Sequence, residues 1–242
     1  MPSTLTVLAT NRLLAALPNK DRTRLLDHCE QVELVIAETL YRAGEPISHV
    51  YFPTGSFISM VMPIDDGARL EVGLVGTEGM LGVTLILGVD AAPFDAVVQG
   101  AGTALRLTTA AFLHDLAQSP ALLQGLKHYL YVSITQLAQT AACNRYHVVE
   151  ARLARWLLMS QDRAHSDCFH VTHLFLAFML GVRRVGITKA ANSLQQQKLI
   201  SYHRGDITII DRVGLEAAAC GCYRAGQETY ERIMKEERQS LL

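Results

Sequence analysis

The chain has 242 residues, half of which are apolar, and a formal net charge of −1. This length fits one large or two modest domains, and the apolar content suffices for a buried core. The composition excludes a membrane-spanning helix, because the longest nearly apolar run, residues 80–89, is too short to cross a bilayer. Asn11 and Arg12 interrupt the amino terminus before a signal-peptide core forms, so we expect a cytoplasmic protein.

Acidic and basic residues separate along the chain. Residues 1–120 carry 7 Lys or Arg against 13 Asp or Glu, whereas residues 170–212 carry 6 against 2. An acidic front half followed by a compact basic patch is typical of a regulatory domain joined to a DNA-binding domain. The basic patch by itself also fits an ordinary solvated helix face, so this alternative stays open here.

Residues 1–119 are expected to form mainly short strands and turns. The apolar run 57–62 and the alternating run 70–74 are typical of strands, and ten of the 17 glycines lie in this part, at turn-like positions. Many short strands joined by glycine turns favour a small sandwich or barrel.

A long helix is expected to begin at Ser119 and Pro120, because Ser is a favoured N-cap and Pro fits the first helical turn. No further Pro occurs up to residue 159. An unbroken helix of about 40 residues would span roughly 60 Å, which is too long for one face of a small domain. We therefore expect a helix that pairs with a second copy or joins two domains, with a break near 145–149; two ordinary helices are the alternative.

The most informative pattern lies in residues 171–210. Apolar residues at helical spacing predict the inner face of a first helix, namely Val171, Leu174, Phe175 and Phe178. Gly181 ends this pattern, and the inner face of a second helix follows with Ile187, Ala190, Ala191 and Leu194. Residues 203–206 are typical of a hairpin turn, and Ile207 and Ile209 alternate as in a half-buried strand. This order predicts a winged helix-turn-helix that binds DNA.

The chain resembles the CRP/FNR family of bacterial transcription regulators over nearly all of its length. The resemblance rests on the order and spacing of several short motifs, none of which is decisive alone. They are Val50–Pro53, Asp66–Gly67, Glu71–Val72, Gly76–Gly82, Cys143–His147, Arg152–Leu158, Leu180–Arg184, Leu199–Gly205 and Gly214–Glu216. The resemblance implies an α+β chain with a cyclic-nucleotide-binding-like β-roll over residues 1–119. It also implies a dimerisation helix over 120–147 and a winged helix-turn-helix domain with a C-terminal helix over 148–242.

The same resemblance implies which residues contact DNA. Arg184 matches the arginine whose planar fork bonds both acceptors of a guanine in the major groove, and Lys189 matches a second basic position of that helix. Thr172 and His173 match positions that touch the phosphate backbone at the start of the first helix. The lesser candidates are Arg183, Thr188 and Asn192. Val185 stands where several relatives have a Glu that reads cytosine, so we expect a different base preference at that position.

For an effector, the resemblance implies a pocket around Gly76, Glu78 and Gly79. We do not expect cyclic AMP there. The arginine that pairs with the nucleotide phosphate in the family's cyclic-nucleotide binders falls near Phe94, and no cation replaces it. The polar pair that meets the purine falls near Leu137 and Ala138, which are apolar, so the phosphate charge would be buried unpaired.

Other cofactors have little support in the sequence. The five cysteines are an odd number without repeated spacing, which argues against a disulfide framework, and the amino-terminal half has only Cys29, so no iron-sulfur motif is present. We expect Cys220 and Cys222 to pack in a terminal helix rather than bind metal. The scattered histidines that could in principle hold haem are His28, His49, His114, His128 and His147.

The resulting prediction is a homodimeric, non-enzymatic transcription regulator that binds a palindromic operator in double-stranded DNA, with RNA polymerase as an expected partner. Leu126, Leu130 and Leu137 are the expected dimer-interface residues. Two other functions remain as alternatives. A cupin-type metalloenzyme would need clustered His ligands, and residues 1–120 contain no His-x-His or His-x-x-x-His pair. A pure interaction module would leave the basic helix without a role.

Overall fold

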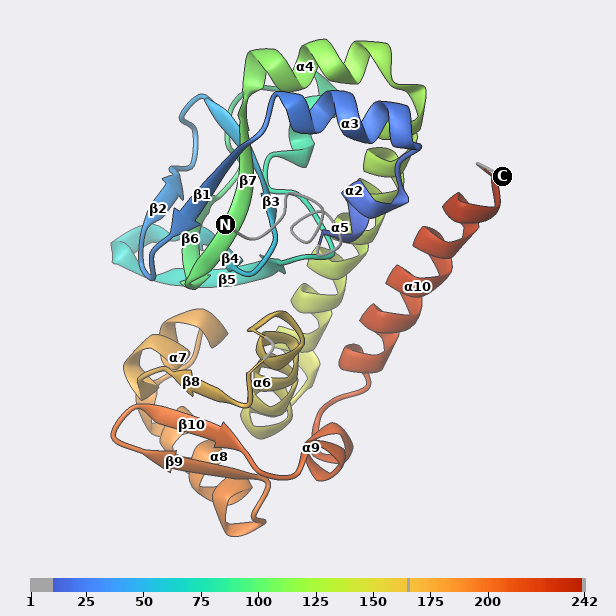
Figure 1. Ribbon diagram of the computed structural model, residues 1–242. Helices are drawn as coiled ribbons and strands as arrows, with labels where there is room; N and C mark the ends of the chain where they lie inside the picture. Colours follow the sequence, from blue (N-terminus) through green and yellow to red (C-terminus); the bar gives the residue numbers. More distant parts are fainter. Residues whose placement is uncertain (1–10, 165, 241–242) are drawn as a thin grey trace. The chain divides into compact units, whose positions relative to one another are not determined.

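The computed structural model describes residues 11–164 and 166–240 of the chain (Figure 1). The first ten residues, on which the expectation about a signal peptide partly rests, lie outside the described residues. The described residues form two compact units: unit 1 takes residues 11–60, 74–134 and 229–240, and unit 2 takes 61–73 and 135–228. Within the described ranges, no helix combines the length and apolar character needed to cross a membrane.

Residues 30–108 form two antiparallel sheets, and residues 61–73 of the second sheet belong to unit 2. One sheet has the strand order β1-β7-β3 and the other β2-β6-β4-β5. The strands are β1 (Glu30–Leu34), β2 (Thr39–Tyr41), β3 (His49–Pro53), β4 (Phe57–Pro63), β5 (Arg69–Val75), β6 (Asp95–Gly100) and β7 (Gly102–Thr108). Two short 3-10 helices, η1 (Asp65–Gly67) and η2 (Val83–Leu87), interrupt the strand sequence. The predicted strand-rich front half is therefore confirmed.

Three helices of unit 1 were not predicted. They are α2 (Arg12–Ala16), α3 (Asn19–Asp27) and α4 (Thr109–Gln118). Asn11 caps α2 by accepting a hydrogen bond from the Leu14 amide, and Thr108 caps α4 in the same way at Ala111. In Figure 1, α3 and α4 lie side by side above one end of the sheets. Phe52 and Phe112, both fully buried, belong to the core that these elements share.

The long helix α5 (Pro120–Tyr146) begins as predicted, because Ser119 Oγ accepts a hydrogen bond from the Leu122 amide at 3.0 Å. It ends before His147 and Val148, and α6 (Val149–Ala164) follows, so the predicted break is confirmed. The prediction that Leu126 lies in the dimer interface is not supported. Its side chain is 1% exposed and belongs to the core of unit 1, so it has no free surface to offer a partner.

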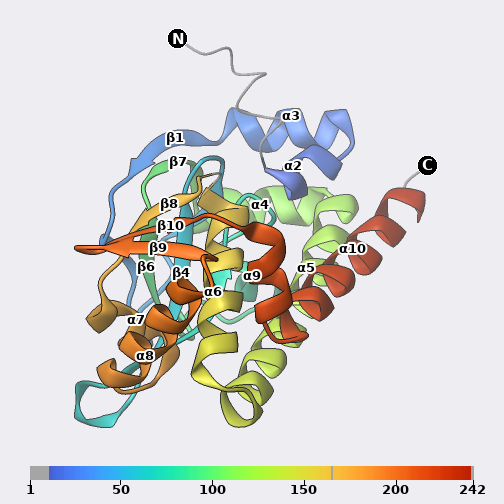
Figure 2. The ribbon, with the colours of Figure 1, turned by 90° about the horizontal axis from the view of Figure 1, so that it is seen from below.

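Unit 2 holds a helix-turn-helix next to a small sheet of order β8-β10-β9 (Figure 2). After α6, its elements are β8 (Cys168–His170), α7 (His173–Leu180), α8 (Arg184–Gln196), β9 (Ile200–His203), β10 (Asp206–Ile209) and α9 (Arg212–Ala218). The last helix, α10 (Cys222–Ser240), begins in unit 2. The β9–β10 turn has positive φ at Arg204 (51°) and Gly205 (97°), as a two-residue primed hairpin turn requires.

The predicted inner face of α8 is confirmed, since Ile187, Ala190, Ala191 and Leu194 are all buried. The predicted inner face of α7 is wrong in part. Leu174 and Phe178 are 52% and 44% exposed, and the buried residues of the helix are Leu176, Ala177, Met179 and Leu180. Because α7 is apolar almost all round, helical spacing alone fits more than one face.

Candidate nucleic-acid interface

The turn between α7 and α8 fixes the position of the second helix. Gly181 adopts a left-handed conformation (φ 60°) as the C-cap of α7, which a side chain would strain. Ile187 and Leu194 on α8 are completely buried in a core that also contains Leu153 and Leu157 of α6. With its inner face held in this way, α8 can present only its outer face to a partner.

The outer face of α8 is basic and unpaired. Arg183, Arg184 and Lys189 are exposed, and none of their side chains forms a hydrogen bond or salt bridge with another residue in the described part of the chain. Asn192 is exposed as well. Val185, which follows Arg184 in the first turn of α8, is 59% exposed. The helix contains no Asp or Glu, so its positive charge is not offset along its own length.

Thr188 and His173 form a small network between α8 and α7. Thr188 Oγ1 donates to the Arg184 carbonyl at 3.2 Å and lies 3.1 Å from His173 Nδ1, which then carries the proton and donates to Thr188. The His173 ring stacks on Tyr202 with 4.2 Å between ring centroids. Burial, and then the charge of Arg184, lower the pKa of His173, so the ring is neutral at pH 7. His173 therefore holds α7 against α8 and β9, a role that its sequence pattern did not indicate.

Thr172 lies at the N-terminus of α7. It is exposed, and its Oγ1 accepts a hydrogen bond from the Phe175 amide at 3.2 Å. The first turn of a helix has amides without a partner inside the helix, and Thr172 stands beside them. This combination is suited to an anion such as a phosphate.

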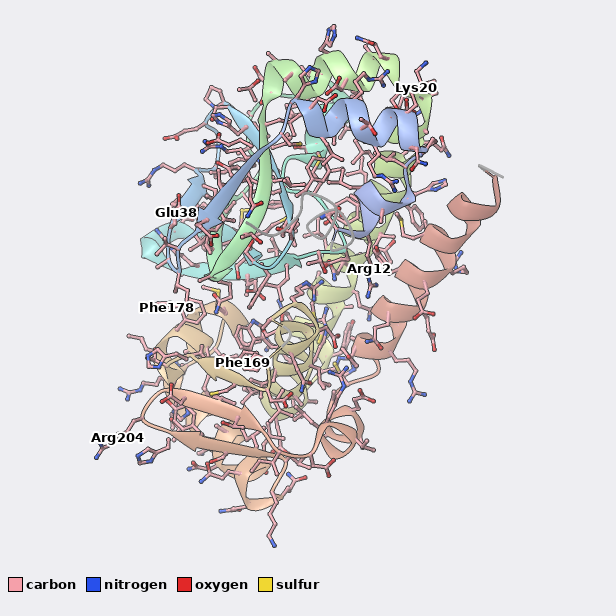
Figure 3. All side chains as sticks on the ribbon, in the orientation of Figure 1. Arg12, Lys20, Glu38, Phe169, Phe178 and Arg204 are labelled. Atoms are coloured by element: carbon pink, nitrogen blue, oxygen red, sulfur yellow. The ribbon has the colours of Figure 1, made fainter. Side chains whose placement is uncertain are left out.

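Sequence reasoning missed Arg204, at the tip of the β9–β10 hairpin. Its side chain projects away from the turn into solvent (Figure 3). The sequence does carry a signal for Arg204, because this basic residue directly precedes Gly205 in the predicted hairpin turn. The wing thus adds a second basic element to unit 2.

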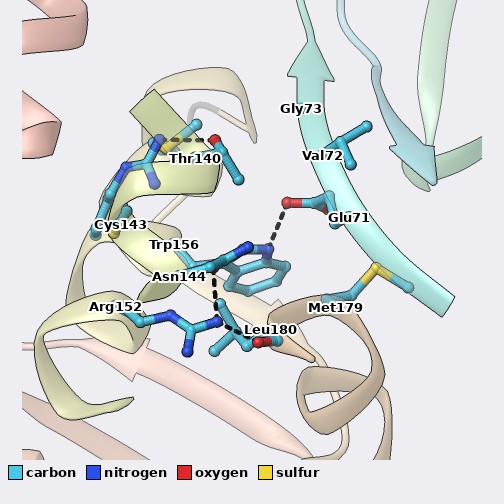
Figure 4. Close-up of a pocket in the computed structure, with 12 residues that line it drawn as sticks. Glu71, Val72, Gly73, Thr140, Cys143, Asn144, Arg152, Trp156, Met179 and Leu180 are labelled. Carbon is cyan, nitrogen blue, oxygen red and sulfur yellow. Dashed lines mark hydrogen bonds between the residues drawn. The ribbon is translucent and has the colours of Figure 1, made fainter. Parts of the chain in front are cut away.

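Within unit 2, a buried hydrogen bond joins β5 to α6. Trp156 Nε1 of α6 donates to Glu71 Oε1 of β5 at 2.9 Å (Figure 4). Arg152 donates to the carbonyl of Leu180 at the end of α7 and, at 2.7 Å, to Asn144 Oδ1. Within unit 2, these contacts link the end of α5, α6 and the end of α7 to Glu71 of β5.

The predicted effector residues lie together in unit 1, in the loop after β5. Gly76 donates its amide to Glu78 Oε1 at 3.2 Å, while Asn11 Nδ2 donates to the Gly79 carbonyl at 2.9 Å. Tyr230 donates its hydroxyl to the Glu78 carbonyl at 3.0 Å. A Cβ atom on Gly79 would lie 2.0 Å from the Tyr129 hydroxyl, so that ring fills the space directly above the glycine.

Of the predicted dimer residues on α5, Leu130 and Leu137 are partly exposed. Ile134 lies between them at the i+4 and i−3 positions and is 56% exposed, and Tyr131 is 52% exposed. The exposed apolar surface of α5 therefore centres on Ile134, which is not among the predicted dimer residues.

Comparison with known proteins agrees with this arrangement. Residues 151–218 match the family model described as a Crp-like helix-turn-helix domain. The global nitrogen regulator of Synechococcus elongatus is 24% identical over 188 residues, which cover 74% of this chain and 84% of that protein.

Two solved structures share the fold. A putative transcriptional regulator of the CRP/FNR family from Eubacterium rectale has a TM-score of 0.67 and 14% identity, covering 87% of this chain and 98% of its own. A CRP/FNR-family transcriptional regulator from Thermus thermophilus has a TM-score of 0.65 and 20% identity, covering 78% of this chain and 98% of its own. Residues 151–218 therefore match a Crp-like helix-turn-helix domain, and the chain shares its fold with solved structures of CRP/FNR-family regulators.

Proposed function

We propose that the protein is a homodimeric, sequence-specific DNA-binding regulator whose helix α8 enters the major groove. The observation that carries this proposal is the unpaired basic outer face of α8, held by a fully packed inner face. Arg183, Arg184 and Lys189 have no partner among the described residues, so binding to an anionic partner breaks no internal contact. A duplex supplies the missing charge, and releases its counterions when the cations bind.

The roles of individual residues follow from their positions. Arg184 is proposed to bond a guanine through its two-pronged guanidinium, and Lys189, one turn further along α8, a base or phosphate. Val185 has no hydrogen-bonding group and is proposed to contact a thymine methyl. Thr172, exposed beside the first amides of α7, is proposed to hold a phosphate, whereas His173 is proposed to position the two helices.

A dimer is proposed to form through α5. Leu130, Ile134 and Leu137 follow the i, i+4, i+7 spacing of one helix face and are all at least partly exposed. Pairing two such helices would remove their apolar surface from water, and the dimer would carry two recognition helices for successive major grooves, about 34 Å apart.

We do not propose a cyclic nucleotide as the effector. The loop that would hold it already packs against Asn11, Tyr129 and Tyr230 of the same unit. A ligand there would have to displace these side chains, and Phe94 offers its phosphate no positive charge.

The test is selection of operators from a palindromic random library, followed by binding titrations with purified protein. The triple variant Arg183→Ala, Arg184→Ala, Lys189→Ala is expected to lose the selected operator. Arg224→Ala is the matched control, since it removes an exposed cation from α10. Failure to enrich any sequence, or equal losses in the triple variant and the control, would refute the proposal.

A further inference from the structure

Four metal-binding side chains converge within unit 2. Cys143 lies in the last turn of α5 and His147 directly follows that helix, while Cys220 and Cys222 lie where α9 leads into α10. Their ligand atoms all lie within 4.8 Å of one another. Cys143 Sγ is 3.5 Å from Cys220 Sγ, and Cys222 Sγ is 3.5 Å from His147 Nδ1. Two segments more than 70 residues apart in sequence thus supply two ligands each.

The two 3.5 Å separations are close to those between ligand atoms of a tetrahedral zinc site, and the whole set lies within 4.8 Å. Zinc binds thiolate sulfur at about 2.3 Å and imidazole nitrogen at about 2.0–2.1 Å, so the ligand atoms of such a tetrahedron lie roughly 3.5–3.8 Å apart. The Cys143 Sγ–Cys220 Sγ and Cys222 Sγ–His147 Nδ1 separations, both 3.5 Å, fall at the lower end of this range. Three thiolates with one imidazole are an established structural zinc set, and soft thiolates disfavour magnesium or calcium.

Packing alone does not explain the cluster. Cys143, Cys220 and Cys222 are 1%, 8% and 4% exposed, which apolar packing would accept. The exposed His147, however, directs a ring nitrogen at a buried sulfur, and Gln139 Nε2 donates to Cys222 Sγ at 2.9 Å. A disulfide between Cys143 and Cys220 would leave the other two ligands unused.

The surroundings also suit a bound ion. One zinc ion with three thiolates and a neutral imidazole has a net charge of −1, which requires compensation at a buried site. The positive charge of Arg155 interacts electrostatically with Cys143, and that of Arg152 with both Cys143 and Cys220. The exposed edge of His147 gives the ion a way in.

We propose that the protein binds one zinc ion through Cys143, His147, Cys220 and Cys222, and that the ion ties the end of α5 to the α9–α10 connection. Binding releases the thiol protons to solvent and changes no oxidation state, since zinc is redox-inactive. Because α6 begins two residues after His147, the ion also fixes the α5–α6 junction. The proposal is independent of which DNA sequence, if any, the protein reads.

The test measures metal in the purified full-length chain, without DNA. After growth with added zinc and a brief chelator wash, elemental analysis is expected to find one zinc per chain. Replacement by Co²⁺ should give the intense sulfur-to-cobalt charge-transfer absorption and the strong visible bands of tetrahedral thiolate coordination. Cys220→Ser should lose the zinc and weaken the cobalt spectrum. The matched control is Cys168→Ser, which removes an exposed cysteine on β8 outside the cluster.

A second variant separates ligand loss from misfolding. His147→Ala changes an exposed side chain, and should keep the wild-type circular dichroism while binding zinc more weakly. Zinc at a small fraction of one per chain, with no cobalt spectrum after reconstitution of the reduced protein, would overturn the proposal. So would equal zinc contents in Cys220→Ser and Cys168→Ser, or a Cys143–Cys220 disulfide found by peptide mapping of the natively purified chain.

Discussion

Replacing Arg184 by alanine isolates a single proposed base contact. Its side chain is exposed and has no hydrogen-bond or ion-pair partner in the described residues, so the substitution removes no such bond in the free protein. The effect on binding should therefore fall on the complex. A bidentate arginine–guanine contact discriminates against the wrong base by about 1–3 kcal/mol, which corresponds to about 5- to 150-fold in the ratio of dissociation constants.

The assay is fluorescence anisotropy at fixed salt, with the selected operator and with operators substituted one base pair at a time. Arg184→Ala should bind the selected operator more weakly and lose its preference at one base pair of each half-site. Lys189→Ala is the comparison: if it holds a phosphate, binding should weaken evenly across sequences and the salt slope should fall by about 1. An unchanged preference profile in Arg184→Ala would refute the assigned contact.

Three further predictions concern other parts of the chain. Leu130→Glu should place a charge in the α5 pairing face and give monomers with weak DNA binding; a dimer seen by light scattering would contradict this. Because burial lowers the pKa of His173 below its ordinary 6.5, the unfolded chain binds more protons. Unfolding free energy should therefore fall as pH drops below about 6.5, and His173→Gln should flatten that slope in urea titrations; an equal slope would count against the neutral ring. Gln139→Leu removes the donor to Cys222 Sγ and should weaken zinc affinity about 10- to 100-fold in competition with a chelating dye, while unchanged affinity would exclude a role for this contact.

The sequence predicted α8 better than α7 for a physical reason. On α8, charged and apolar residues alternate with the helical period, so only one face can be buried, and Ile187 and Leu194 lie there. On α7, the residues from Leu174 to Leu180 are all apolar, so every face satisfies the spacing. Tertiary contacts then decide, and they bury Leu176 instead of Leu174.

Contacts between distant segments could not be read from the sequence. Cys143 and His147 have the spacing of one helix face, and Cys220 and Cys222 form a short pair, but neither pair alone makes a metal site. Only the path of the chain from α5 to α9 brings the two pairs together. Likewise, the position of Tyr129 in its helix predicts only that its side chain is buried. That its ring lies against Gly79 depends on the fold of unit 1.

The hydrogen bond between Trp156 and Glu71 joins residues 85 positions apart and makes a stability prediction possible. Both side chains are buried, at 5% and 8% exposure, so water cannot replace the bond when it is removed. Trp156→Phe keeps an aromatic ring but loses the donor, and should lower the unfolding free energy by about 1.5–3 kcal/mol, the usual value for a bond to a charged group. Since Trp156 is the only tryptophan in the chain, urea unfolding must be followed by circular dichroism.

Glu71→Gln is the matched control for Trp156→Phe, because it retains a side-chain oxygen that can accept from the indole N–H. If the hydrogen bond itself stabilises unit 2, Glu71→Gln should cost less than Trp156→Phe, because a neutral acceptor weakens the bond without removing it. Equal losses would indicate that the charge of Glu71 matters more than the bond. A loss below about 0.5 kcal/mol in Trp156→Phe would mean that the indole N–H contributes nothing, and that the end of the β4–β5 hairpin is held to α6 by packing alone.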